Sequence, residues 1–315
     1  MFTFAGKLHI NNFSCIMANV IKIKKGLDIN LKGKASDVLL NGGKSESYAI
    51  VPDYYNGILP KVVAKVGEKV KAGSVLMIDK NRPEIKFVSP VSGEVTAVNR
   101  GEKRKVLSIV VKPDAQIEYE EFGKKNVASL QGAEVKEVLL NAGMWPFIKQ
   151  RPYDIVAAPL DTPRDIFVSA FYSAPLAPNF DFIVKGQEAD FQTGLNALAK
   201  LTNGKVYVGV RSGSVVSGMK GVEIVEVEGP HPAANVGVQI NHIKPVNKGE
   251  VVWTVNPADV IVIGRLFNKG VADFSRMVAI TGSETTERGY VKTISGCTIK
   301  SLVNGKAVSY THLRA

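Results

Sequence analysis

The chain has 315 residues, of which 45% are hydrophobic and 22% charged, and 40 Lys and Arg against 29 Asp and Glu give a net charge of +11. This size and balance exclude disordered, collagen-like and disulfide-stapled chains and allow two or three domains, each with a core. The two cysteines, Cys15 and Cys297, are too few to hold an iron–sulfur cluster or a cysteine-rich zinc site by themselves.

The apolar stretches, the N-terminal residues and the distribution of lysines indicate the cellular compartment and the kind of partner. No apolar stretch approaches the roughly 20 residues of a membrane-spanning helix, and the first sixteen residues lack the apolar core of a secretory signal. We therefore expect a cytoplasmic protein, with Met17 as an alternative start. The lysines are spread along the chain without an accompanying aromatic stripe, so a solvated basic surface is favoured over nucleic acid binding.

Residues 1–47 are interpreted as an N-terminal extension and segment, and residues 48–113 as the first organised unit. There, short runs rich in Val and Ile are bounded by Gly, Pro or Asn, which predicts many short strands and no long helix. A Gly-Glu-Lys turn followed by an apolar run occurs at Gly67 and again at Gly101. Two such units can close a small flattened barrel.

This unit resembles the barrel-sandwich hybrid of biotinyl and lipoyl carriers, in which a segment such as Pro90-Val91-Ser92-Gly93 starts the second half. In those carriers the modified lysine lies at a hairpin tip, and Lys80 stands near that place. However, Asn81-Arg82-Pro83 lengthens this hairpin. An unmodified structural module is therefore favoured over a swinging-arm carrier.

Residues 134–282 carry a helix-and-strand pattern. Apolar residues recur at helical spacing from Val135 to Ala142, and Gly143 ends that helix. Asn256 is the expected N-cap of a helix that starts at Pro257. The remaining predicted elements are strands 166–169, 205–210, 222–227 and 277–281, and helices 189–201 and 257–269. This alternation predicts a Rossmann-like α/β domain, with a parallel sheet and covering helices.

The sequence of this domain contains few recognisable catalytic or cofactor-binding motifs. No dinucleotide glycine loop, Walker motif or zinc-protease motif is present, and Gly209 to Ser214 is favoured as an ordinary loop over a phosphate cradle. His231, between two prolines after a strand, is either a polar group in a cleft or subunit contact, or a loop histidine bonded to nearby backbone. His242 is predicted to lie on the wetter face of a strand.

Several segments resemble those of one protein family and occur in the same order as in that family. They are Ile21–Asp28, Lys86–Pro90, Arg151–Tyr153, Asp161–Val168, Gly204–Tyr207, Gly229–Ala233, Trp253–Val255 and Asp259–Phe267. From Met17 to about Val303 the chain resembles the A subunit of the sodium-translocating NADH:quinone oxidoreductase, the NqrA family.

The resemblance implies a peripheral subunit on the cytoplasmic face of the bacterial inner membrane. The whole complex couples electron transfer from NADH to ubiquinone to Na⁺ export (EC 7.2.1.1), and its NADH oxidation, flavins and iron–sulfur cluster belong to other subunits. This chain is then a scaffold or quinone-facing component docked on the flavin-carrying B subunit in the membrane. It implies no catalytic residue, metal or cofactor in this chain.

The resemblance also implies a fold similar to the FMN-binding subunit of respiratory complex I, whose glycine-rich loop would fall at residues 143–149. Trp145, Pro146 and Phe147 replace those glycines, and a backbone with such side chains cannot bring consecutive amides against a phosphate. Trp145, Phe147 and His231 are therefore candidates for contact with quinone or a partner, with core packing as the alternative for the two aromatic residues.

Two other protein classes share parts of this pattern, and the C-terminal residues depart from the family. The C subunit of the Rnf ferredoxin–NAD oxidoreductase shares both domains but carries cysteine-rich ferredoxin motifs, which are not seen here. A free biotin or lipoyl carrier is weakened by the longer hairpin. Residues 283–315 are expected to be the truncated start of a β-grasp-like (SLBB-type) domain, with Ser309–Ala315 a foreign or damaged end.

Overall fold

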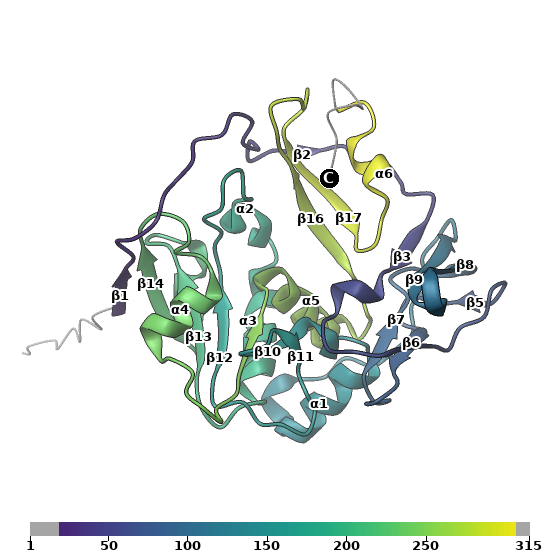
Figure 1. Cartoon of the computed structure of the whole chain (residues 1–315), viewed down its shortest axis with the longest axis horizontal. Helices are drawn as coiled ribbons and strands as arrows, with labels where there is room; N and C mark the ends of the chain where they lie inside the picture. The colour runs from purple at the N-terminus through teal and green to yellow at the C-terminus, as the bar shows by residue number, and fades with distance from the viewer. Residues whose placement is uncertain (1–18, 307–315) are drawn as a thin grey trace, which may run out of the picture.

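The computed structural model describes residues 19–306. A seven-stranded sheet with its helices occupies the centre, a sandwich of short strands lies beside it, and a small three-stranded sheet lies above both (Figure 1). The expectations for Cys15, for a start at Met17 and for Ser309–Ala315 fall outside the described residues.

The central sheet is mostly parallel. Its strands, in spatial order, are β1 (Asn19–Lys22), β14 (Glu223–Glu228), β13 (Val206–Val210), β12 (Ile166–Ser169), β15 (Val252–Val255), β10 (Ile148–Arg151) and β11 (Ile155–Val156). The first five strands in this order run parallel, whereas β10 pairs antiparallel with β15 and with β11. The predicted strands 166–169, 205–210 and 222–227 are confirmed within a residue at each end.

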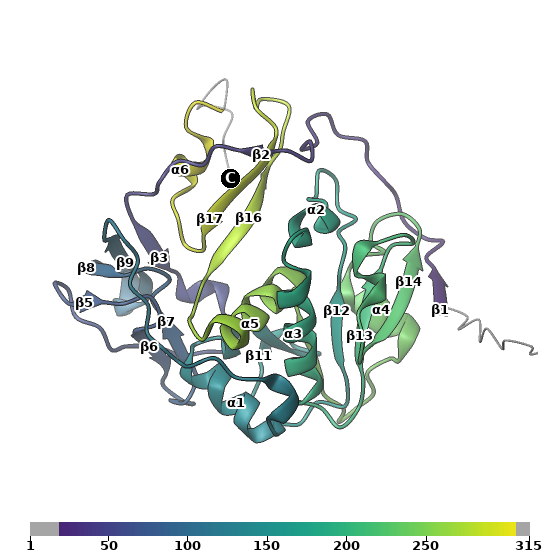
Figure 2. The ribbon, with the colours of Figure 1, turned by 180° about the vertical axis from the view of Figure 1, so that it is seen from behind.

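Helices cover both faces of this sheet. The chain steps from β12 through β13 to β14, then crosses back over β12 to β15, and right-handed connections place the intervening helices on opposite faces. α3 (Glu188–Ala199) and α5 (Pro257–Lys269) lie side by side on one face, and α4 (Val236–Ile243) lies on the other (Figures 1 and 2). This is the predicted doubly wound α/β arrangement.

Local signals explain where two of the helices start and stop. Asn256 accepts a hydrogen bond from the Ala258 amide at 3.0 Å and caps α5, as predicted. α1 (Gly132–Asn141) is followed by Gly143, whose φ of 67° suits a glycine just past a helix end.

Two sequence predictions for this region are wrong. The strand expected at 277–281 is β16 (Ser275–Ile280), which pairs antiparallel with β17 (Gly289–Ile294) in a separate sheet instead of joining the parallel one. The short helix α6 (Ile299–Val303) follows this hairpin. His242 lies in the last turn of α4, because the apolar residues around it also fit helical spacing.

Residues 48–113 form two small sheets without a long helix, as expected. The first contains β3 (Tyr48–Ile50), β9 (Val106–Pro113), β8 (Gly93–Arg100) and β5 (Lys69–Val70), and the second β4 (Pro60–Val62), β6 (Val75–Asp79) and β7 (Lys86–Val88). The repeated Gly-Glu-Lys turns lead into β5 and β9. Leu76, Val95 and Ile109 fill the space inside.

The segment before residue 48 takes part in two other sheets. β1 forms one edge of the central sheet, and β2 (Leu39–Leu40) pairs parallel with β17. Residues 22–37, which we call the strap, connect them across the carboxyl edge of the central sheet (Figures 1 and 2). Gly26 fits against the His231 carbonyl, and Gly33 against Gly282, where a Cβ would come within 2.3 Å.

Candidate functional site at the carboxyl edge of the sheet

A crevice opens where the carboxyl ends of β12 and β15 meet. The chain leaves β12 toward one side of the sheet and enters β15 on the other, so this is the topological switch point, where α/β folds usually bind ligands. The crevice has a volume of about 620 Å³. Its chemically distinctive lining residues are Phe147, Lys149, Arg151, Asp154, Tyr172, Asn256 and Asp259.

Phe147 separates this crevice from a smaller apolar cavity. It ends a 3₁₀ turn that begins at Trp145 and leads directly into β10. Its ring is partly buried, lies edge-on to Phe274 at 6.1 Å between centroids, and faces the Arg276 guanidinium at 5.3 Å. The smaller cavity, of about 160 Å³, is lined by Phe147 and Arg276 together with Tyr55 from the strand sandwich.

An ion pair connects the two spaces. The Arg276 guanidinium donates a short hydrogen bond to Asp259, which lies in the first turn of α5. Burial opposes the charge of Arg276, but the adjacent Asp259 carboxylate outweighs that effect and raises the pKa of Arg276. The Arg276 guanidinium therefore stays protonated at neutral pH; Asp259 lines the crevice, and Arg276 lines the apolar cavity.

Two tyrosines near this pair remain protonated. Burial, with the charge of Asp259 adding to it, raises the pKa of Tyr55 to about 12. Burial also raises the pKa of Tyr172 to about 12, although its hydroxyl donates to the Asn256 side chain at 3.3 Å. Burial lowers the pKa of Lys149, whose ammonium lies 5.2 Å from the centre of the Tyr55 ring. The site thus offers neutral hydroxyl donors beside apolar rings.

Trp145 is not exposed to the crevice. Its side chain is fully buried, its indole N–H donates to the Ala157 carbonyl at 2.8 Å, and its ring meets Trp253 edge-on at 5.4 Å. Core packing, the alternative given for this residue, accounts for all of these contacts.

His231 lies beside the strap rather than in the crevice. Its amide donates to Asp28 at 2.7 Å, its carbonyl accepts from Leu27 at 3.0 Å, and its Nδ1 lies 3.0 Å from the Ser173 hydroxyl. These contacts fasten the strap to the loop after β14, and the imidazole contacts a side-chain hydroxyl instead of the nearby backbone.

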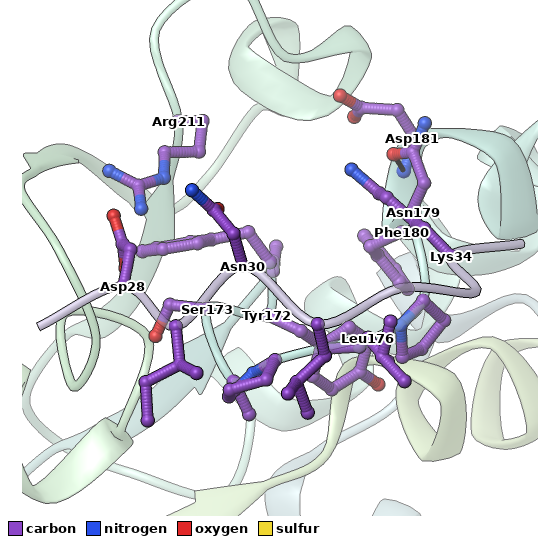
Figure 3. Close-up of a pocket in the computed structure, with 18 of the residues that line it drawn as sticks. Asp28, Asn30, Lys34, Tyr172, Ser173, Leu176, Asn179, Phe180, Asp181 and Arg211 are labelled. Atoms are coloured by element: carbon purple, nitrogen blue, oxygen red, sulfur yellow. Dashed lines mark hydrogen bonds between the residues drawn. The ribbon is translucent and has the colours of Figure 1, made fainter. Parts of the chain in front are cut away.

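A polar pocket of about 410 Å³ lies under the strap (Figure 3). Asp28 and Asn30 of the strap face loop residues that follow β12 and β13. Arg211 there donates to the Gly229 carbonyl at 2.8 Å and stacks on Phe171 at 4.7 Å, and Asp181 accepts from Ser214. The pocket's main charges therefore already serve to hold the loops together.

The features expected of a phosphate or swinging-arm site are not formed. A Cβ on Gly209, which lies within β13, would come 2.1 Å from the Gln239 side chain, so α4 packs directly against the end of this strand. At the β6–β7 hairpin, Arg82 binds the buried Asp79 at 2.8 Å and the Val156 carbonyl at 3.1 Å. This holds the hairpin that carries Lys80 against the α/β domain.

Two further properties of the described residues concern metal binding and membrane spans. Within residues 19–306, no group of three or more His, Cys, Asp or Glu side chains is arranged to hold a metal ion. None of the helices in the described part of the chain is long and apolar enough to cross a membrane.

Comparison with protein families identifies the architecture. The NqrA N-terminal barrel-sandwich hybrid domain matches residues 21–114, the NqrA second alpha/beta domain residues 130–272, and the NQRA C-terminal domain residues 277–315. The chain belongs to the NqrA family. The barrel-sandwich hybrid and the α/β domain predicted from the sequence are thereby confirmed.

Curated relatives agree with this family. The A subunit of the Na(+)-translocating NADH-quinone reductase of Hahella chejuensis is 37% identical over 295 residues, which cover 92% of this chain and 66% of the relative. The same subunit of Neisseria meningitidis is 36% identical with the same coverage, and that of Photorhabdus laumondii 35%, over 91% and 65%. The chain thus spans just under two thirds of these relatives' length. Nothing among these findings supports the Rnf alternative.

Sequence reasoning misses most of the crevice in this NqrA-family chain. Tyr172 lines the crevice, and Tyr55 and Arg276 line the smaller cavity beside it. These three residues come from separate segments, and none has a recognisable motif around it. The one signal is Asp259, an acidic residue in the first turn of the helix that Asn256 caps. Of the three contact candidates that the sequence suggests, only Phe147 lines the crevice.

Proposed function

We propose that this chain is a peripheral subunit of a Na⁺-translocating NADH:quinone reductase, on the cytoplasmic face of the membrane and docked on the B subunit, which lies in the membrane. The observation that carries the proposal is the ordered match of all three NqrA domains, supported by relatives named as the A subunit of that enzyme. NADH oxidation, flavins and the iron–sulfur cluster are assigned to the other subunits.

We further propose that the switch-point crevice has lost a flavin site and faces quinone. A phosphate at the start of α5 would meet the Asp259 carboxylate, while Asn256 already caps the helix. Gly143 packs on Val88, 2.6 Å from where its Cβ would lie, so residues 143–149 present no open row of amides. These features disfavour FMN and leave a crevice lined by the Phe147 ring, by the neutral Tyr172 hydroxyl and by several charged side chains.

A quinone ring suits the remaining chemistry. Phe147 supplies an aromatic face at the crevice wall. The neutral Tyr172 hydroxyl can turn its one hydrogen from the 3.3 Å contact with Asn256 to a quinone carbonyl. The scaffold role and the quinone-facing role are distinguishable, because only the second depends on these side chains. We retain His231 as a residue that shapes a partner-facing loop, and Trp145 as core.

Substitution of Phe147 tests the quinone-facing role. In the assembled complex, Phe147→Ala should raise the KM for quinone about fivefold, since a lost ring contact costs roughly 1 kcal/mol. NADH oxidation by an artificial acceptor should not change. Phe182→Ala is the matched control, because Phe182 is also partly buried and packs on Tyr290 outside the crevice. An unchanged quinone KM in the Phe147 variant would leave the scaffold role alone.

A further inference from the structure

The strap exposes an unusual run of aliphatic side chains. Leu27 is 69% exposed, Ile29 55% and Leu31 56%, although Ile29 and Leu31 also border the polar pocket. Single exposed aliphatic residues are common, but three within five positions of one segment form a continuous apolar feature. Ile23, in contrast, is buried in a small core under the strap, so the segment is anchored without the other three.

Lysines surround these side chains. Residues 22–34 contain five lysines, all exposed: Lys22, Lys24, Lys25, Lys32 and Lys34. The only acidic residue in that range, Asp28, accepts a hydrogen bond from the His231 amide. Lys22 also lies 3.5 Å from the exposed Glu228, which partly offsets its charge. The strap as a whole is therefore basic and apolar at once.

The strap is also held at fixed points. Gly26 lies against the His231 carbonyl, and the Gly282 amide donates to the Gly33 carbonyl at 2.9 Å. Residues 27–32 consequently run between two clamps at the outer rim of the molecule (Figures 1 and 2). A segment fixed in this way loses little further conformational freedom when its side chains bind a flat surface.

We propose that the strap binds an anionic lipid bilayer surface. Lysines attract acidic head groups, and each one near the surface strengthens binding several-fold. Aliphatic side chains between them can enter the head-group boundary while the lysine ammonium groups stay in water. Charge complementarity favours this occupant over an uncharged protein surface.

Vesicle co-sedimentation of the 315-residue chain tests the proposal. Binding should occur with phosphatidylcholine vesicles containing about one third phosphatidylglycerol, and should be absent with phosphatidylcholine alone and weak at high salt. Combined Leu27→Ser, Ile29→Ser and Leu31→Ser should lower the partition coefficient at least about tenfold. Combined Lys24→Gln, Lys25→Gln and Lys32→Gln should do the same.

Matched controls come from the strand sandwich. Val63→Ser, Val66→Ser and Leu107→Ser remove three other exposed aliphatic side chains, and Lys61→Gln, Lys65→Gln and Lys103→Gln three other exposed charges. Both control sets should bind within about twofold of the unaltered chain. No binding to anionic vesicles, or equal losses in strap and control variants, would overturn the proposal.

A fluorescence measurement keeps the test valid if a triple variant unfolds. The two native tryptophans, Trp145 and Trp253, are fully buried, so a new one reports its own surroundings. Emission from Leu27→Trp should shift to the blue with anionic vesicles, whereas emission from Leu160→Trp, at a site 93% exposed, should not. A Leu27→Trp spectrum unchanged by vesicles contradicts the proposal. The proposal needs neither other subunits nor quinone, so its failure leaves the proposed function standing.

Discussion

At the scale of single residues, the ion pair of Asp259 and Arg276 connects the crevice to the apolar cavity. Their side chains are 14% and 23% exposed, so neither charge is well hydrated. Asp259→Asn should destabilise folding by about 3 kcal/mol, because it leaves the guanidinium without its anion. Urea unfolding measures this, and adding Arg276→Met to the variant should restore part of the loss. A loss below about 0.5 kcal/mol in Asp259→Asn would show that solvent already screens the pair.

Asp273 makes stability depend on acidity. Burial opposes its charge, but hydrogen bonds from Ser275 and the charge of Arg265 outweigh it and lower the pKa of Asp273 to about 2. The lowered pKa stabilises the fold above the unfolded value near 4, and that contribution should disappear as the pH falls from about 4 to about 2. Unfolding free energies should show up to about 2 kcal/mol of this loss. Asp273→Asn should remove that part of the pH dependence; an identical pH profile would refute the assignment.

Sequence reasoning at this scale reaches residues with local signatures only. Asn256 is recognisable as a cap because the cap, Pro257 and the apolar run that follows are adjacent in sequence. Tyr55 and Arg276 meet only through the fold, so no pattern along the chain predicts their contact. His231 stands out by its prolines, but its partner Asp28 lies on a strand connection distant in sequence.

At the scale of elements, the packing of α3 on α5 depends on two glycines. A Cβ on Gly264 would lie 1.7 Å from the Asp190 carbonyl, and one on Gly194 would lie 2.1 Å from the Val260 carbonyl. Gly264→Ala should therefore cost about 2–3 kcal/mol through displaced backbone, despite the higher helix propensity of alanine. Gly237→Ala in α4 is the control, since nothing lies within 4 Å of that position. Thermal unfolding of both variants decides this, and equal Tm values would contradict the close crossing.

Elements are predictable from the sequence where helix and strand periods differ clearly, and less so where pairing partners are distant. The sequence of β16 suggests a strand of the parallel sheet. It pairs instead with β17, the next strand along the chain, and the two form an antiparallel hairpin. β1 and β2 join sheets built from much later residues, which no local pattern indicates. The domain bounds drawn from the sequence, with residues 1–47 apart, and the β-grasp likeness of residues 283–315 stay predictions.

At the scale of the whole molecule, the strand sandwich acts as a structural module. Arg82 fixes the Lys80 hairpin by donating to the Gly57 and Val156 carbonyls, so the lysine is not presented on a free tip. We expect the peptide that contains Lys80 to have the mass of its unmodified sequence, without a lipoyl or biotinyl adduct. Mass spectrometry of protein from its own cells measures this. An added mass located on Lys80 would restore the carrier hypothesis.

Deletion of the gene tests most directly whether the chain acts as a subunit of an assembled quinone reductase. Membranes from the deletion strain should lose Na⁺-dependent quinone reduction by NADH, because the proposed quinone-facing subunit is missing. They should keep NADH oxidation by an artificial electron acceptor, which needs only the NADH-oxidising subunit. Quinone reduction that persists at the parental rate in the deletion strain would contradict the account.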